Sequence, residues 1–183
     1  MKPLNILISK RIASLCLAAV SLSAAAMAAA GEAEDVAGLL QAGRYQEALS
    51  RIDALPRDVG AQPQIRLYRG MSLMALDRRN EAFHSFEALA AEHPNMPEPF
   101  NNMAVIQAAN GRYGDARVLL ENALRADAGY SVALENLGDV YIKMANHTYA
   151  RLRTLGPQRK AVRKRHETVQ SVSRLIERPG SPR

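Results

Sequence analysis

The 183-residue sequence predicts an all-α fold, a solenoid of about four helix–turn–helix units of 34 residues followed by a C-terminal capping helix. A periodic alanine is the first observation, and it recurs every 34 residues, at Ala48, Ala82, Ala116 and Ala150. A small residue with the same spacing is the second, at Gly70, Ala104 and Gly138. A period of 34 residues is the length of one helix–turn–helix repeat. Strands find no support in the sequence.

The two sets of small residues have a physical reason in such a repeat. Antiparallel helices approach closely only where small side chains allow it. We therefore expect the Gly or Ala of each first helix to face the Ala of the second helix, Ala104 against Ala116 and Gly138 against Ala150. A bulky residue at these positions would overpack the contact.

The turn of each repeat has its own phase in the sequence. The residues at this phase are Gly43, Asp77, Gly111 and Ala145. Gly43 and Gly111 are expected to end the first helices of repeats one and three, because glycine accepts the backbone conformation that closes a helix. After Gly111 the apolar residues recur at i, i+3, i+4, i+7 and i+8, which predicts an amphipathic second helix with Ala116, Leu119, Leu120, Ala123 and Leu124 on one face.

The same reasoning along the whole chain gives the expected elements. Helices are predicted at about 33–42, 45–55, 63–76, 79–92, 97–109, 113–126, 131–144 and 147–155. Gly156-Pro157 breaks the pattern. A final helix is predicted over roughly 158–177, with Val162, Val169, Val172 and Ile176 on one face, because repeat arrays need a terminal helix to cover the last apolar surface. The expected domains are a signal peptide over 1–30, the solenoid over 31–155, a basic helix over 156–178 and a disordered end over 179–183.

Three short motifs carry a resemblance to a known family. LGDVY from Leu137 to Tyr141, the alanine and phenylalanine of Ala82 to Phe86, and Pro94 follow the tetratricopeptide repeat pattern. The resemblance covers about residues 33 to 155. No tryptophan occurs at the first-helix signature position, where Phe100 and Leu134 stand, and the first unit has Asp35-Val36 in place of Leu-Gly.

The first thirty residues differ from the rest. Lys2, Lys10 and Arg11 precede an uncharged run, IASLCLAAVSLSAAAMAAA, which is typical of a secretory signal peptide. We expect cleavage near Ala28 or Ala30 and a periplasmic location; the alternative is an uncleaved N-terminal anchor in the inner membrane. The single cysteine, Cys16, lies inside this segment, so the processed chain would have no thiol for a disulfide or a thiolate metal site.

Charge is distributed unevenly along the chain. Residues 31–150 contain 11 Lys or Arg and 16 Asp or Glu, whereas residues 151–183 contain ten basic residues and two acidic ones. Such asymmetry indicates a tail that meets an anionic lipid surface, an acidic partner or the acidic body of its own chain. The candidate basic contacts are Arg159, Lys160, Arg163, Lys164 and Arg165. The acidic body argues against nucleic acid as the main ligand.

Motifs for catalysis are missing from the sequence. There is no P-loop, GxGxxG or HExxH pattern. The four histidines are scattered, and each is expected on a helix surface. Glu135 and Asp139 stand four residues apart, which we interpret as an acidic stripe and not as acid–base machinery. The sequence therefore predicts no enzyme, no cofactor and no metal.

The resemblance implies where a partner would bind. In tetratricopeptide domains the first helices line a concave groove, and the matching positions here are Leu67, Met71, Met74, Asn101, Val105, Ala108, Glu135, Asp139, Ile142 and Lys143. This groove would be apolar at one end and acidic at the other, which suits a basic amphipathic helix. Met71 and Met74 could instead belong to the core. Of the residues that bind a C-terminal carboxylate in the family, only Asn101 has a counterpart.

These expectations favour a non-enzymatic adaptor or scaffold of the bacterial cell envelope that binds a peptide or protein. One alternative is a peripheral protein held on anionic lipid by its basic C-terminal helix, which could also dock on the groove as a cap or a competitor. Another is an accessory subunit that presents substrate to an envelope enzyme. The identity of the partner and the oligomeric state stay open.

Overall fold

A computed structural model describes residues 31–156 and 159–176. Within those two ranges the chain is helical with no strand, which confirms the all-α prediction. The proposed signal peptide and the predicted disordered end lie outside the described residues. The chain divides into two compact units, one up to Leu76 and one from Asp77, and each is described by itself.

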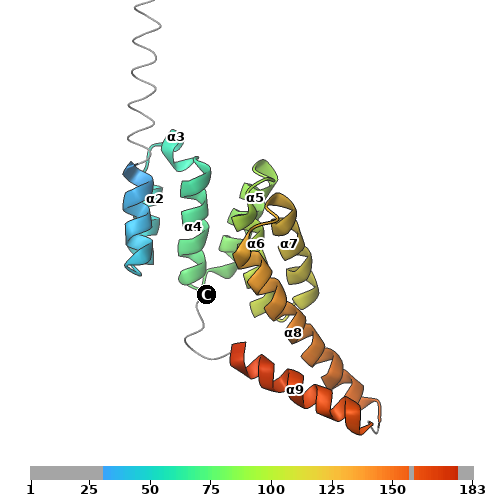
Figure 1. Cartoon of the computed structure of the whole chain (residues 1–183). Coiled ribbons are helices and arrows are strands. Elements are labelled where there is room, and N and C mark those ends of the chain that lie inside the picture. Colours follow the sequence, from blue (N-terminus) through green and yellow to red (C-terminus); the bar gives the residue numbers. More distant parts are fainter. Residues whose placement is uncertain (1–30, 157–158, 177–183) are drawn as a thin grey trace, which may run out of the picture. The chain divides into compact units, whose positions relative to one another are not determined.

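The first unit is a small helical cluster (Figure 1). It comprises a helix over residues 31–41, α2 (Tyr45–Asp53), α3 (Arg57–Gly60) and α4 (Pro63–Ala75). Its core is made by Val36, Ala48, Ile52 and Ile65. The single turn of α3 was not predicted; it follows Pro56, whose extended backbone stops the chain after α2.

The second unit holds the remaining helices (Figure 1). These are α5 (Arg79–Glu92), α6 (Pro97–Ala109), α7 (Tyr113–Ala126), α8 (Ser131–Thr154) and α9 (Lys160–Ile176). Each helix packs on the next along the chain, and α6 also contacts α8. Such nearest-neighbour packing is the arrangement of a helical repeat array.

The turns of the first three repeats share one backbone device. Gly43, Asp77 and Gly111 have positive φ angles of 71°, 59° and 74°. After α6 the Gly111 N–H donates to the Ala108 carbonyl and the Arg112 N–H donates to the Gln107 carbonyl, both at 2.9 Å. These two bonds satisfy the last carbonyls of the helix, so the predicted helix ends are confirmed.

An arginine and an acidic residue also recur after each of these turns. Arg44 Nε donates to Glu47 at 2.7 Å, and Arg78 Nε donates to Glu81 at 2.8 Å. In the third repeat Arg112 and Asp115 lie 3.9 Å apart. The acid stands in the first turn of each second helix, where it complements the helix dipole. The hydrogen bond from Arg44 lowers the pKa of Glu47.

The fourth repeat contradicts the prediction. Helices 131–144 and 147–155 were expected to be separate, but α8 runs without interruption from Ser131 to Thr154. The turn position holds Ala145, and Asn146 and Tyr149 replace the arginine and the acid. Alanine favours the helix interior and avoids positive φ, so nothing in this segment ends the helix before Gly156, whose φ is 130°.

The close contact expected in the fourth repeat is therefore wrong as well. In the third repeat Ala104 and Ala116 are 1% and 0% exposed and share one core cluster. Gly138 and Ala150 are both exposed, and a Cβ added to Gly138 would meet no atom within 4 Å. Their second helix never folds back across α8, because the turn is missing.

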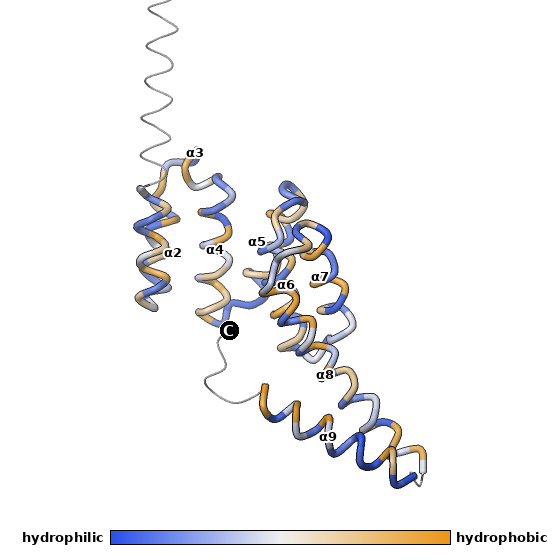
Figure 2. The backbone as a smooth tube through the Cα atoms, viewed as in Figure 1, coloured by the Kyte–Doolittle hydropathy of each residue, from blue (hydrophilic) through white to orange (hydrophobic). Residues whose placement is uncertain are grey.

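The C-terminal helix α9 packs on α8, and its amphipathic character is visible as alternating hydrophobic and hydrophilic stretches (Figure 2). Val162, Val169 and Ile176 are partly buried as expected, but Val172 is 36% exposed. His166 is 5% exposed, so its assignment to the helix surface was wrong.

Candidate functional site

The first-unit part of the predicted groove lies on α4. Leu67 is buried, while Met71 and Met74 are partly buried. Both methionines therefore keep some exposed surface, and the unbranched thioether side chain can adapt its shape to a partner.

In the second unit the predicted residues come from α6 and α8, which contact each other. Asn101 is 5% exposed, and its Oδ1 accepts a 2.8 Å hydrogen bond from Asn136 Nδ2. This bond ties the two helices together, so Asn101 has a positioning role. Val105 and Ala108 are partly buried, and Ala108 packs against the core.

The acidic end of the predicted groove lies on α8. Glu135 is exposed, and Asp139, Ile142 and Lys143 are partly buried. Burial raises the pKa of Asp139, the Glu135 carboxylate raises it further, and the Lys143 ammonium acts in the opposite direction. Glu135 and Asp139 thus interact as an acidic pair, as expected from their spacing.

A third carboxylate near this region was missed by the sequence analysis. Glu98, in the first turn of α6, has an Oε2 atom that is buried and without a hydrogen-bond partner among the described residues. Burial raises the pKa of Tyr130 at the start of α8, and the charge of Glu98 raises it further. A glutamate at a helix start is a common capping feature, so the sequence held no signal that set Glu98 apart.

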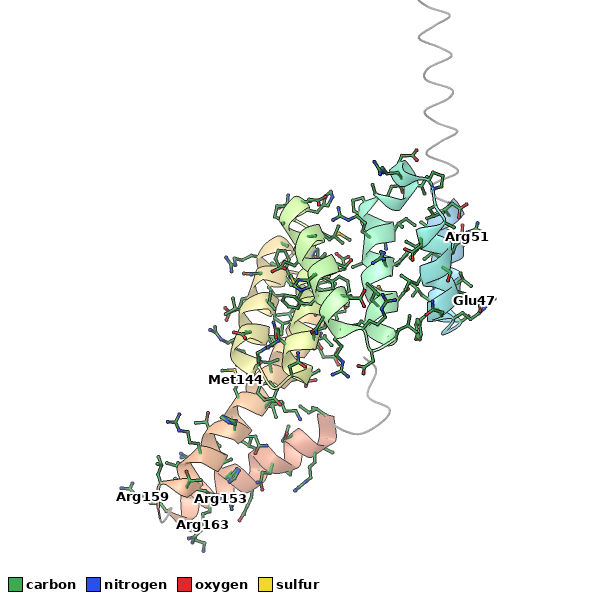
Figure 3. All side chains as sticks on the ribbon, turned by 180° about the vertical axis from the view of Figure 1, so that it is seen from behind. Glu47, Arg51, Met144, Arg153, Arg159 and Arg163 are labelled. Carbon is green, nitrogen blue, oxygen red and sulfur yellow. The ribbon has the colours of Figure 1, made fainter. Side chains whose placement is uncertain are left out.

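All five predicted basic contacts are exposed on or just before α9. Arg151 and Arg153, at the end of α8, are exposed as well. Figure 3 shows Arg153, Arg159 and Arg163 together at the end of the hairpin that α8 and α9 form.

No group of three or more metal-ligating side chains occurs in the described ranges. None of the helices described there is long and apolar enough to span a membrane.

The fold and these surfaces define the chain as a helical-repeat protein that offers side-chain surfaces for interaction. A family model described as the coatomer epsilon subunit matches residues 61–175, more than half of the chain. The chain belongs to the coatomer epsilon subunit family, an all-helical, tetratricopeptide-like family of non-catalytic structural and adaptor proteins that have protein partners. A search of curated proteins found no match.

Proposed function

We propose that this chain is an exported adaptor of the bacterial cell envelope, which binds a basic amphipathic segment of a peptide or protein partner. The family supports a helical interaction scaffold, and compartment and ligand are our addition. The export step rests on the signal-peptide pattern of residues 1–30. N-terminal sequencing of the protein from periplasmic extracts tests it, and a new N-terminus near residue 29 or 31 is expected.

The observation that carries the proposed ligand is the acidic pair on α8. Glu135 is exposed and Asp139 lies beside it with a raised pKa, so Lys143 does not fully compensate their charges. A cation of a partner would lower the free energy of both carboxylates. The partly exposed Met71 and Met74 on α4 offer apolar surface for the other face of an amphipathic helix.

Site-specific photo-crosslinking in intact cells tests this function. A crosslinking residue would replace Met74 or Asp139, and Val118, which is 44% exposed on α7, would serve as the control. We expect the same discrete partner at positions 74 and 139 and not at 118. Equal trapping at all three positions, or crosslinks confined to α9, would contradict the proposal.

A further inference from the structure

The hairpin of α8 and α9 encloses a cavity of about 370 Å³. It exists because the fourth repeat does not turn, so the second half of α8 continues as one wall while α9 forms the other. The cavity far exceeds the roughly 30 Å³ that one water molecule occupies, so it can hold a small polar group with its hydration water.

Cationic and hydrogen-bonding side chains line this cavity. Arg153 and Tyr149 reach it from α8, and Arg163, His166 and Gln170 reach it from α9. Glu167 is the one carboxylate in the lining. The arginine side chains are forked donors that match the oxygens of a phosphate group.

His166 gives an independent indication of a ligand. Its ring stacks on Tyr149, with centroids 5.9 Å apart and an angle of 26° between the planes. The residue is 5% exposed, and its Nε2 is buried without a hydrogen-bond partner within the part of the chain that the structure describes. Buried polar atoms are nearly always paired in folded proteins, so a ligand that accepts a hydrogen bond at this place would complete the site.

The charge around the cavity has the same sign. Residues 151–176 contain eight Lys or Arg and a single acidic residue, Glu167. Arg153, Arg159 and Arg163 lie at the end of the hairpin in Figure 3. Such a cluster raises the local concentration of anions.

We propose that the cavity between α8 and α9 binds a phosphate group, held by Arg153, Arg163 and the Nε2–H of His166. The site is independent of the partner surface on α4, α6 and α8. An anionic phospholipid headgroup or a free phosphate compound could supply the group. Leu155 favours the headgroup, because this side chain is 75% exposed next to Gly156, which lines the cavity, and it can insert among lipid chains.

The experiment compares two double variants of the full chain that carry the same change in charge. Arg153→Gln with Arg163→Gln alters the cavity. Arg151→Gln with Arg165→Gln alters one exposed arginine on each of the same two segments outside the lining. Inorganic phosphate is titrated while the ring resonances of His166 are followed by NMR, and circular dichroism verifies the helical content of each variant.

We expect the His166 resonances to respond in the wild-type chain and the control. The cavity variant should bind phosphate at least about tenfold more weakly, because it loses two charge-assisted contacts. Absence of a response in the wild-type chain, or equal weakening in both variants, would overturn the proposal.

Vesicles distinguish the two sources of the phosphate. Phosphatidylcholine vesicles with and without phosphatidylglycerol are sedimented with the wild-type chain and with Leu155→Ser. A headgroup ligand predicts stronger binding to the phosphatidylglycerol vesicles and a loss in Leu155→Ser, whose phosphate titration stays unchanged. Equal binding to both kinds of vesicle would overturn the lipid source and support a soluble phosphate ligand, provided the NMR response is present.

Discussion

The third and fourth repeats begin with similar sequences and end in different structures. The third repeat turns at Gly111, and its helices α6 and α7 bury Ala104 against the same core as Ala116. The fourth repeat has alanine at the turn and continues as the single helix α8. Its counterparts Gly138 and Ala150 are exposed. The comparison teaches that one backbone position decides whether a repeat closes on itself or becomes one arm of a new hairpin.

The largest expected difference between the two repeats concerns core leucines. Leu120 on α7 is 1% exposed, whereas Leu134 on α8 is 53% exposed. Leu120→Ala should lower the free energy of unfolding by about 2–5 kcal/mol, because it leaves a cavity. Leu134→Ala should change it by less than about 0.5 kcal/mol. Urea denaturation measures both, and a similar loss in the two variants would show that the exposed face of α8 is covered.

Overpacking distinguishes the two periodic alanines. Ala116→Leu places a large side chain at a fully buried position and should cost about 1–3 kcal/mol. Ala150→Leu adds the same atoms to an exposed helix surface, so the melting temperature should stay close to that of the parent chain. A large loss in Ala150→Leu would mean that Ala150 packs as its counterparts do.

The two glycines should respond with opposite signs. Gly111 has a φ of 74°, so Gly111→Ala forces alanine into the left-handed region at a cost of about 1–2 kcal/mol. Gly138 lies inside α8 with open space at the Cβ position, so Gly138→Ala should stabilise by up to about 1 kcal/mol. Thermal melts report both changes. Destabilisation by Gly138→Ala would indicate a close helix contact there.

The smallest expected effect is pH-dependent and concerns Asp139. Its pKa is raised in the folded chain, so folding favours the protonated carboxyl and stability falls as pH rises from the ordinary aspartate value through the raised one. Asp139→Asn should remove this penalty and stabilise the chain at neutral pH by no more than about 1 kcal/mol. Below the ordinary pKa the parent and the variant should unfold alike. Glu121→Gln on α7 is a control for the loss of one negative charge.

Much of the fold could be predicted from the sequence, because repeats two and three carry helix-stop and small-residue signals that agree with one another. The predicted bounds 79–92, 97–109 and 113–126 coincide with α5, α6 and α7. The fourth repeat was wrong because Gly138 and Ala150 kept the period while the turn did not. The missing signals were local, namely alanine at 145 and the absent arginine–acid pair at 146 and 149.

The candidate sites were less accessible to sequence reasoning. Positions in a repeat predicted which residues of α6 and α8 lie near each other, but not that Asn136 would engage Asn101. The cavity at His166 depends on α9 packing against a helix that was expected to end earlier. A contact between two helices of different repeats has no periodic signature, so only the structure brings Tyr149 and His166 together.

The length of α8 is the most direct test of this account. Spin labels at Val132→Cys and Thr154→Cys, in a chain with Cys16→Ser, mark the two ends of the helix, and pulsed electron paramagnetic resonance measures their separation. A continuous helix predicts about 33 Å, because each residue rises about 1.5 Å. A separation below about 20 Å would mean that the fourth repeat folds back into two helices with axes about 8–10 Å apart, and it would contradict both the hairpin and its cavity.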